Sequence, residues 1–440
     1  MAGRELHVWS NGQLLGVWSW TRSGTHMFTY ADSWLVSPQI RALSLSLPIT
    51  AGVKEVRGAV VKNFFDNLLP DSDKIRERVR ARYALGSTDA QELLGAIGRD
   101  CVGAIQLLPG GITPDGYKEV RGIALGEADV EKILKSVTSG ATPGDDDDDF
   151  RISIAGAQEK TALLKVDEQW YRPQGATPTT HILKLPLGLV GNMQADMSTS
   201  VENEWLCARI MAALGFEVAA TSMHRFGSQK VLVVERFDRR WVDGGSWIVR
   251  LPQEDLCQAS GISPQKKYER DGGPGILQCM ALLASSARAD QDRLAFALAN
   301  LTFWLLAATD GHAKNFSIFL HAGGRHSMTP LYDILSVWPI IGKGGKQLMR
   351  QKARLAMAIR SKNAHYELDK ILTRHWMVVA QQSGVNGAFD AMKSLVERVA
   401  AALETVEKQL PEDFPVQVWN SIRDGMLAQK KRFQAGLEAM

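Results

Sequence analysis

The feature that most constrains this chain is a group of polar residues directly after its most apolar stretch. Asp310 and Asn315 stand five residues apart within residues 307–316, and a second carboxylate, Asp333, follows after a short β-prone segment. This is the order of general base, metal-binding amide and metal-binding carboxylate in a phosphoryl-transfer centre of the kinase kind. On one continuous helix, residues five apart point about 140° away from each other and cannot share a ligand. We therefore expect Gly311 to let the chain leave the preceding helix.

The apolar stretch before this group, residues 294–308, is interrupted by Asn300 and Thr302. It is shorter than the ~20 residues that a membrane-spanning helix needs, so we expect a buried helix and no membrane association. The amino terminus lacks the apolar core of a signal peptide. The net charge of +3, from 51 Lys and Arg against 48 Asp and Glu, is too small to indicate charge-driven binding to nucleic acid.

The four cysteines are scattered and form no C-x-x-C pair, so the sequence indicates neither a zinc site nor a disulfide framework. They are Cys101, Cys207, Cys257 and Cys279. A reduced, cytoplasmic compartment is the simplest interpretation. A chain of 440 residues with 45% hydrophobic content is expected to form two or three domains, at roughly 100–200 residues each.

The first 47 residues show the alternation of β-strands. Asn11-Gly12 between two such runs predicts a hairpin, and residues 43–47 alternate at period two and end at Pro48, which predicts a half-buried strand. Two helices are expected next, over residues 61–69 and 73–83. Later helices are expected near 127–137, over 200–214, and over the carboxyl-terminal ranges 367–382, 389–409 and 415–439.

Residues 145–149 are five consecutive aspartates, which repel one another and are typical of a solvated linker rather than of a metal site. We place a domain boundary near them. The expected organisation is a β-rich and helical subdomain over 1–145, a core with phosphate loop, Lys strand and hinge over 146–250, and a helical lobe over 251–440.

Other parts of a nucleotide site follow in kinase order. Small residues between two β-prone runs at 153–160 predict a turn whose backbone N–H groups face phosphates, although an ordinary hairpin has the same pattern. Lys184 lies in an apolar strand, where it needs a charge partner or a phosphate unless it is an edge residue. Glu204 on the next helix is a candidate partner, and Glu235 and Phe237 end an apolar strand as a hinge to adenine does.

The roles of the loop residues follow from this order. Asp310 is expected to be the base, and Asn315 and Asp333 are expected to bind Mg²⁺ through oxygen. His312 and Lys314 contact phosphate or steady Asp310, unless His312 is a structural residue. The competing interpretation, a transition-metal site of Asp310, His312 and Asp333, lacks a second histidine.

These motifs together make the chain similar to the HipA family, the serine/threonine-kinase toxins of bacterial toxin–antitoxin modules. The segments that carry the resemblance are NFFDNLLPD (63–71), IGRD (97–100), SIAGAQEK (153–160), VERFD (234–238), LPQED (251–255) and ATDGHAKN (308–315). The resemblance covers nearly the whole chain. It implies an α+β, two-lobed fold related to protein kinases and phosphoinositide kinases, with a small β-rich amino-terminal subdomain, an all-α carboxyl-terminal lobe, and ATP and Mg²⁺ as cofactors.

The resemblance also implies which residues hold ATP. They are Ala155, Gly156, Ala157, Gln158, Glu159, Lys160, Lys184, Glu235, Arg236, Phe237, Gln253, His312, Lys314 and Tyr332. The loop of residues 310–315 also fits the D-x-H-x-x-N pattern of lipid kinases, which leaves a lipid or small-molecule kinase as an alternative.

Family members phosphorylate themselves on a serine of the phosphate loop, and Ser153 occupies that position. A phosphate there adds nearly two negative charges beside an ATP site, so we expect the loop to be expelled and the enzyme to turn off. The aspartates at 145–149 depart from the family pattern and are expected to affect this loop.

The resemblance implies a small helix-turn-helix antitoxin as partner, with operator DNA bound mainly through that antitoxin. Residues 376–385 carry no Lys or Arg, so direct contact of this chain with DNA is expected to be minor. The implied acceptor is glutamyl-tRNA synthetase, whose phosphorylation arrests growth and promotes persistence. A catalytically weak kinase fold that serves mainly as a transcriptional corepressor is the alternative from another functional class.

Overall fold

The computed structural model describes residues 5–139, 153, 156, 158–191 and 194–440. It divides into two compact units, which are described separately. The first unit comprises residues 1–185, 224–265 and 318–326, and the second comprises residues 186–223, 266–317 and 327–440. The three domains expected from the sequence stay a prediction, since the first unit combines segments from all three. Among the described residues, no helix has the length and apolar character needed to cross a membrane.

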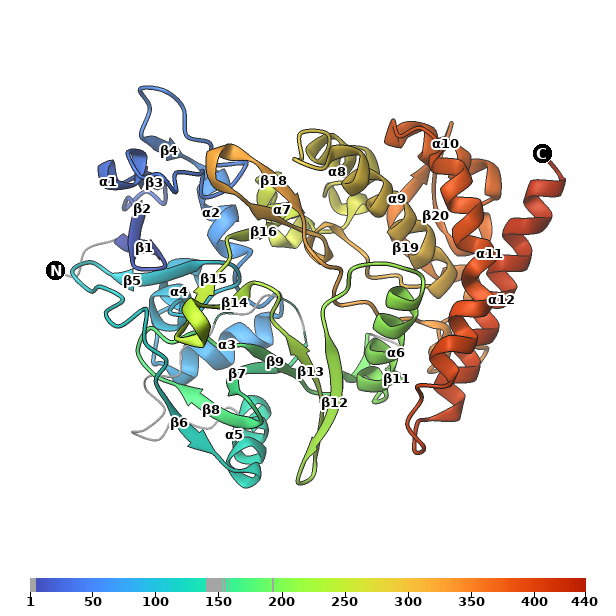
Figure 1. Ribbon diagram of the computed structural model, residues 1–440, viewed down its shortest axis with the longest axis horizontal. Helices are drawn as coiled ribbons and strands as arrows, with labels where there is room; N and C mark the ends of the chain where they lie inside the picture. Colours follow the sequence, from blue (N-terminus) through green and yellow to red (C-terminus); the bar gives the residue numbers. More distant parts are fainter. Residues whose placement is uncertain (1–4, 140–152, 154–155, 157, 192–193) are drawn as a thin grey trace. The chain divides into compact units, whose positions relative to one another are not determined.

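The first unit begins with an antiparallel five-stranded sheet in the order β4-β3-β2-β1-β5 (Figure 1). Its strands are β1 (Glu5–Ser10), β2 (Gln13–Trp20), β3 (His26–Tyr30), β4 (Glu55–Arg57) and β5 (Ile105–Pro109). Asn11 and Gly12 join β1 to β2 with φ of 47° and 79°. Two successive positive φ angles suit a tight hairpin turn, which is why Asn-Gly is favoured there. The expected hairpin and meander are confirmed.

Short helices cover this sheet. They are α1 (Asp32–Leu35), α2 (Ala59–Asp66), α3 (Asp73–Arg82) and α4 (Ala90–Ile97). The apolar face of α2 enters the sheet core, where the Phe65 ring stacks on Trp18 with centroids 4.0 Å apart. Helix α3 begins where the Ser72 hydroxyl accepts a hydrogen bond from the backbone N–H of Ile75. Helices α2 and α3 confirm the two helices expected in this region.

Residues 43–47 do not form the expected strand. Ser44 and Leu47 form an isolated bridge inside a turn. The Tyr30 hydroxyl accepts from Leu43 N and donates to Leu47 O, and the carboxyl group of Glu254 accepts from Leu45 N. The backbone groups that would pair with a neighbouring strand are therefore used by side chains, and the prediction of a strand was wrong.

The second sheet of this unit has the order β12-β13-β9-β7-β8-β6, and β12 belongs to the first unit only from His224 onward. Its strands are β6 (Gly122–Leu125), β7 (Lys160–Val166), β8 (Gln169–Pro173), β9 (His181–Lys184), β12 (Thr221–Phe226) and β13 (Gln229–Glu235). Helix α5 (Glu127–Ser139) packs Val130 and Leu134 against Leu163 and Val231 of this sheet. It confirms the helix expected near 127–137.

Smaller elements complete the first unit. They are the hairpin β14 (Arg239–Val242) and β15 (Trp247–Arg250), the short helix α7 (Leu256–Ala259), and the strands β16 (Gln253–Asp255), β17 (Ser317–Leu320) and β18 (His326–Met328). Ser317 of β17 and residues 327–328 of β18 belong to the second unit. Helix α7 starts with a capping box of Asp255 and Gln258, which satisfies two backbone donors.

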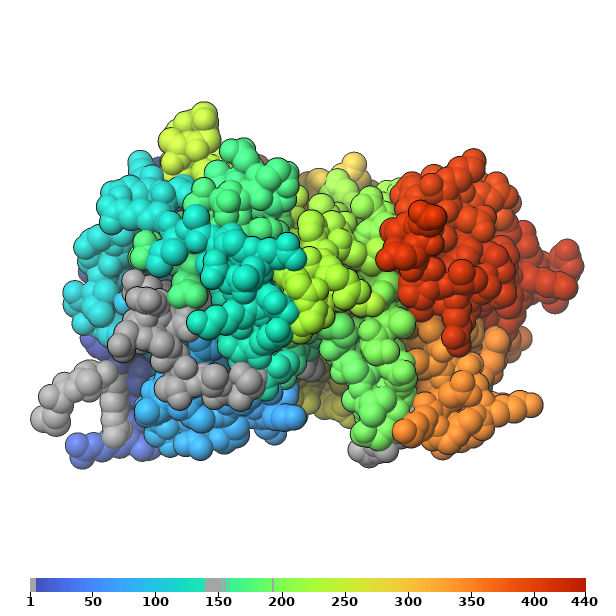
Figure 2. Space-filling model, turned by 90° about the horizontal axis from the view of Figure 1, so that it is seen from below, coloured from blue at the N-terminus to red at the C-terminus, as the bar shows by residue number. Residues whose placement is uncertain are grey.

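The second unit is mainly helical and is built around α9. Its elements are β10 (Gly188–Val190), β11 (Ala195–Met197), α6 (Ser200–Ala213), α8 (Ile276–Leu283), α9 (Ala289–Leu306), β19 (Arg354–Arg360), β20 (Ala364–Glu367), α10 (Thr373–Ser383), α11 (Ala388–Glu407) and α12 (Val416–Glu438). Helices α8, α10, α11 and α12 pack around α9, whose second half is buried. In the space-filling view of Figure 2, α11 and α12 (red) pack as one body. The apolar run of the sequence is thus the central buried helix, as expected.

Candidate active site

The loop of residues 310–315 follows the end of α9, but Gly311 does not end the helix. The helix ends at Leu306, and Ala307 adopts the left-handed conformation with a φ of 50°. Gly311 is required for a different reason, because a Cβ there would lie 2.4 Å from the Phe303 ring. The chain does leave the helix before Asp310, as predicted, but it does so at Ala307 rather than at Gly311.

Residues beyond Asp333 hold the end of α9. The Ser336 hydroxyl donates to Leu306 O at 2.6 Å, and the indole N–H of Trp338 donates to Leu305 O at 3.0 Å. These bonds satisfy carbonyls that a helix end leaves without partners. The side-chain amide of Asn203 on α6 bonds both backbone groups of Ser336. The segment that carries Asp333 is therefore fixed to α9 and α6.

The loop itself is tied together by its own polar groups. The amide nitrogen of Asn315 donates to the carbonyl of Asp310 at 2.8 Å, and His312 N donates to the same carbonyl at 2.8 Å. The imidazole of His312 is buried, with Nε2 3.8 Å from Asp310 Oδ1. The side chain of Asp310 is 58% exposed. Asp310 is thus presented to solvent by a fixed backbone, which is the geometry that the predicted role of general base requires.

Tyr332 joins the Asp333 segment to this loop. Its hydroxyl lies 3.0 Å from Lys314 O and 2.5 Å from the Ser317 hydroxyl. Asp333 follows at once, with a φ of 60° that non-glycine residues seldom adopt. Such backbone conformations are concentrated at functional sites. The second unit therefore brings together Asp310, Asn315 and the Asp333 segment, and it buries Lys314 in the same loop.

The residues present suit Mg²⁺ better than a transition metal. Because the amide nitrogen of Asn315 is bonded to Asp310 O, its other amide atom, Oδ1, remains as a potential ligand. An amide oxygen with the Asp333 carboxylate is a typical Mg²⁺ ligand set, since this ion keeps waters and substrate phosphates. Within the described part of the chain, no group of three or more His, Cys, Asp or Glu residues is placed to hold a metal. The alternative site of Asp310, His312 and Asp333 is therefore not supported.

The first unit carries the expected phosphate loop, of which Ala155 and Ala157 lie outside the described residues. Gly156 has a φ of 112°, and a Cβ on it would lie 2.5 Å from the amine of Lys160. Glycine therefore admits both the turn and the lysine amine. Gln158 donates through Nε2 to Leu185 O at 2.6 Å, and Leu185 N donates to Glu159 O. The loop is thereby attached to the end of β9.

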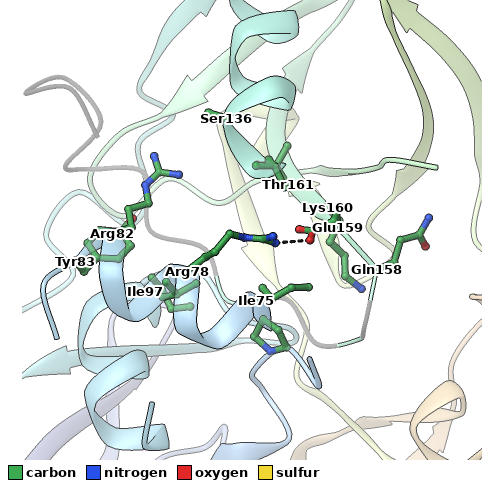
Figure 3. A pocket seen from close by; sticks show the side chains of 13 residues that line it. Ile75, Arg78, Arg82, Tyr83, Ile97, Ser136, Gln158, Glu159, Lys160 and Thr161 are labelled. Carbon is green, nitrogen blue, oxygen red and sulfur yellow. Dashed lines mark hydrogen bonds and ion pairs between the residues drawn. The ribbon is translucent and has the colours of Figure 1, made fainter. Parts of the chain in front are cut away.

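These loop residues line a pocket of about 140 Å³ (Figure 3). Arg78 of α3 points across it to form an ion pair with Glu159, and Arg82 and Tyr83 line the same wall. The carboxylate of Glu159 is therefore held by a guanidinium of the same unit. Arg78 and Arg82 could not be predicted as neighbours of this loop, because nothing in the sequence of α3 indicates that the helix lies beside it.

Lys160 and Lys184 are directly opposite each other in the antiparallel pair of β7 and β9. Lys184 is buried, at 6% exposure. Residues directly opposite each other in such a pair project from the same face of the sheet, so the two lysines lie on one face. Lys184 is therefore not the exposed edge-strand lysine of the alternative interpretation. Glu204 belongs to the second unit, where it is buried on α6, so it is not a solvated first-turn carboxylate.

The expected hinge stands on a buried ion-pair network. All five N–H donors of Arg236 are bonded, to Asp100, Asp238, the Thr179 hydroxyl and Cys101 O. The guanidinium has no donor left for a nucleotide, so we assign the Arg236 side chain to the scaffold rather than to the ATP site. Burial disfavours the charged form of Arg236, but the two carboxylates outweigh this and raise its pKa.

The residues beside Arg236 are better placed to meet a nucleotide. Glu235 is exposed at the end of β13, and the half-buried Phe237 ring meets Phe319 edge to face, with centroids 5.9 Å apart. Gln253 on β16 donates to the Asp238 carboxylate at 3.3 Å. The network therefore orients both Gln253 and the turn that contains Phe237.

Ser153 is fully buried in the first unit. Its hydroxyl donates to Leu68 O at 2.8 Å, and its N–H donates to Asp100 O at 3.2 Å. The run of aspartates at 145–149 lies outside the described residues. None of the four cysteines forms a disulfide, and all four are buried.

The fold and the loop of residues 310–315 define a kinase of α+β class. Comparison with known proteins agrees. Residues 6–108 match the HipA N-terminal domain, and residues 152–409 match the HipA-like C-terminal domain. The chain belongs to the HipA family of serine/threonine-protein kinases.

Two curated relatives and one solved structure illustrate the relationship. The putative kinase Y4mE of Sinorhizobium fredii is 33% identical over 92% of this chain and 93% of its own length. The serine/threonine-protein kinase toxin HipA of Shewanella oneidensis is 31% identical over 63% of each chain. The structure of the toxin–antitoxin system HipA, HipB and operator DNA from Shewanella oneidensis MR-1 has a TM-score of 0.78 at 24% identity, covering 99% of this chain and 98% of that one. At that identity it supports the fold alone.

Proposed function

We propose that this kinase uses ATP and Mg²⁺ to phosphorylate a serine or threonine of a target protein, and that it is the toxin of a toxin–antitoxin module. The observation that carries the catalytic part is the loop in which Asn315 and His312 both bond the carbonyl of Asp310. This loop presents an exposed carboxylate beside an amide that is already oriented, and Tyr332 attaches the Asp333 segment to it.

In the proposed reaction, the acceptor hydroxyl oxygen forms a bond to the γ-phosphorus. The bond from that phosphorus to the bridging oxygen of the β-phosphate breaks, and ADP leaves. The hydroxyl proton passes to the Asp310 carboxylate. Asn315 and Asp333 would hold Mg²⁺, which would supply neutralisation of charge on the phosphates. Lys160, Lys184 and the N–H groups of the loop at Gly156 bind the phosphates, while Glu235, Phe237 and Gln253 hold adenine. His312, Lys314 and Tyr332 shape the catalytic loop.

Ser153 is proposed as an inhibitory autophosphorylation site. A hydroxyl that is fully buried and bonded to Leu68 O cannot accept a phosphate in place, so its segment must leave this position to be modified. Returning a phosphoserine with a charge near −2 beside Leu68 O would bury that charge against a carbonyl, which is strongly unfavourable. Phosphorylation would thus keep the loop away from the ATP site.

We further propose a helix-turn-helix antitoxin as partner, with which the chain acts as corepressor on operator DNA. The printed description of the Shewanella complex, which contains HipA, HipB and operator DNA, supports this. The proposed acceptor is glutamyl-tRNA synthetase, on the ground of family resemblance.

The test is transfer of label from γ-³²P-ATP to purified glutamyl-tRNA synthetase and to the kinase itself. We expect the wild type to label protein and Asp310→Ala to lose on the order of a hundredfold or more in rate. If the wild type and Asp310→Ala transfer label equally, the catalytic assignment is refuted. Self-labelling without labelling of the synthetase would refute the substrate alone. Operator binding with the antitoxin but no kinase activity would favour the corepressor alternative, and transfer to lipid rather than protein would favour a lipid kinase.

A further inference from the structure

Tyr268 is in direct contact with the proposed base, although no motif points to it. Its hydroxyl donates a hydrogen bond to Asp310 Oδ1 within the second unit. Among the described residues, Oδ2 of Asp310 accepts no hydrogen bond. Oδ1 is therefore bound to a phenol, while the Asp310 side chain as a whole is 58% exposed.

The Tyr268 ring contacts a second residue of the catalytic loop. It meets the buried imidazole of His312 edge to face, with centroids 5.1 Å apart and planes at 82°. His312 N in turn donates to the Asp310 carbonyl. The Tyr268 hydroxyl therefore contacts the side chain of Asp310, and the Tyr268 ring contacts the residue that bonds its backbone. Tyr268 thus restrains the Asp310 carboxylate directly and the Asp310 backbone through His312.

The segment that carries Tyr268 is fixed rather than loosely attached. The next residue, Glu269, is 5% exposed in its side chain; its carboxylate binds Arg360 and accepts from Ala358 N on β19 at 2.6 Å. The carbonyl of Tyr268 accepts from Gly273 N at 3.0 Å. A Cβ on Gly273 would lie 2.1 Å from Lys266 O, so the turn is closely packed. The phenol is therefore held by a scaffold that does not depend on its contact with Asp310.

We propose that Tyr268 is a positioning residue for catalysis, which holds Asp310 by Oδ1 so that Oδ2 is directed to the acceptor hydroxyl. This inference rests on the proposed role of Asp310 as base. An exposed aspartate otherwise rotates freely about its side-chain bonds, and a misplaced catalytic group can lose on the order of a hundredfold in rate. The phenol removes this freedom in the way that an orienting partner fixes the base in other enzymes.

The test compares Tyr268→Phe, which keeps the ring on His312 and removes only the hydroxyl, with the wild type in the ³²P transfer assay. We expect kcat to fall on the order of 10- to 100-fold, while the KM for ATP stays within about twofold, since ATP contacts are not altered. Tyr366→Phe is the matched control, because Tyr366 is in the same unit and the described structure gives it no hydrogen bond to Asp310. It should keep full activity.

A double-mutant cycle separates positioning from a structural effect. If Tyr268 acts through Asp310, Tyr268→Phe should cause no further loss in the Asp310→Asn background. An equal fold-loss in both backgrounds would overturn the inference, as would a Tyr268→Phe enzyme within twofold of the wild type. A higher kcat would also overturn it, since the phenol would then compete with the acceptor. In each of these cases Asp310→Asn keeps only a residual rate far below that of the wild type, and the proposed function stands. If Asp310→Asn is as active as the wild type, the proposed function itself fails.

Discussion

The side-chain amide of Asn315 donates a 2.8 Å hydrogen bond to the backbone carbonyl of Asp310, five residues earlier. This bond orients the amide so that its oxygen, rather than its nitrogen, is available as a ligand. It also closes the loop, because Asn315 N donates to His312 O and His312 N donates to the same Asp310 carbonyl. The spacing of five that drew attention in the sequence is thus the spacing of a hydrogen-bonded loop.

Asn315→Ala should therefore remove two functions at once. We expect the unfolding free energy to fall by about 1 kcal/mol for one lost hydrogen bond, and labelling from ATP to fall much further because the proposed Mg²⁺ ligand is gone. The measurements are urea unfolding and the ³²P assay. Asn300→Ala is the matched control, since the Asn300 amide makes a similar buried bond of 2.8 Å to Phe296 O within α9. It should lose comparable stability without losing activity per folded molecule.

Gly311→Ala tests the packing that this glycine permits. Because the new Cβ would lie 2.4 Å from the Phe303 ring, we expect a loss of roughly 1–3 kcal/mol in stability, with reduced kinase activity because the loop must shift. Gly345→Ala places its Cβ in open space and should leave both quantities unchanged. Adding Phe303→Leu to Gly311→Ala should restore part of the loss. A Gly311→Ala protein with wild-type Tm and activity would show that the loop accommodates the methyl group freely.

The network under the hinge predicts a strong dependence on Asp100. This carboxylate bonds Arg236, Arg239 and Arg250, and all of these side chains are at most 8% exposed. Asp100→Asn would leave three buried guanidiniums with Asp238 as their remaining carboxylate. Because breaking a buried ion pair leaves an uncompensated charge, we expect a loss of about 3–5 kcal/mol, measured by urea unfolding. Glu77→Gln removes the exposed pair with Arg80 and should cost less than about 1 kcal/mol.

The same network predicts loss of stability in acid. Burial opposes ionisation of Asp100, but the three guanidiniums outweigh it and lower its pKa well below the ordinary range. A carboxyl group with a depressed folded-state pKa contributes its full stabilisation above the unfolded-state pKa, about 3.9. That contribution is lost as the pH falls below this value toward the folded-state pKa. Asp100→Asn should therefore remove part of the acid sensitivity of unfolding, and an unchanged pH profile between pH 2 and 5 would contradict this.

Local patterns were sufficient for much of the fold. The hairpin at Asn11-Gly12 and the buried helix before Asp310 depend on residues adjacent in sequence, where turn preferences and periodicity decide the structure. The prediction of a strand over residues 43–47 was wrong because distant residues decide the structure there. Glu254 and Gln258, more than 200 positions later, bind the backbone of Leu45 and the hydroxyls of Ser44 and Ser46. Alternation alone cannot reveal that distant residues, rather than a neighbouring strand, will bond those groups.

In the candidate site, too, local features could be predicted from the sequence and long-range contacts could not. The spacing of Asp310 and Asn315 could be interpreted directly, whereas Tyr268 reaches Asp310 across 42 positions and Arg250 reaches Asp100 across 150. Neither contact leaves a local pattern, because each depends on how distant segments pack. The hinge motif predicts that Arg236 contacts the nucleotide, yet the N–H donors of its side chain are all used within the first unit. A motif predicts which residues lie near one another, but it does not predict which partners each side chain contacts.

Glu254 supplies a prediction with the opposite pH sign. Its Oε1 accepts from Leu45 N at 2.8 Å, and no described residue bonds its Oε2. Burial raises the pKa of this carboxyl to about 8, so it is protonated at neutral pH. When the folded-state pKa of an acid is raised, the folded protein holds a proton that the unfolded chain releases above its pKa of about 4.3. The contribution of Glu254 to stability is therefore full below that value and declines until about pH 8.

Glu254→Gln keeps an oxygen for Leu45 N and has no proton to lose. We expect its stability relative to the wild type to rise between pH 5 and pH 8, by at most about 1.4 kcal/mol per pH unit, measured as the difference in unfolding free energy at each pH. Glu92→Gln alters an exposed carboxyl of α4 and should show a difference that does not change over this range. If Glu254→Gln behaves like Glu92→Gln, the Glu254 carboxyl is already ionised when folded, and water or a cation must reach it in the first unit.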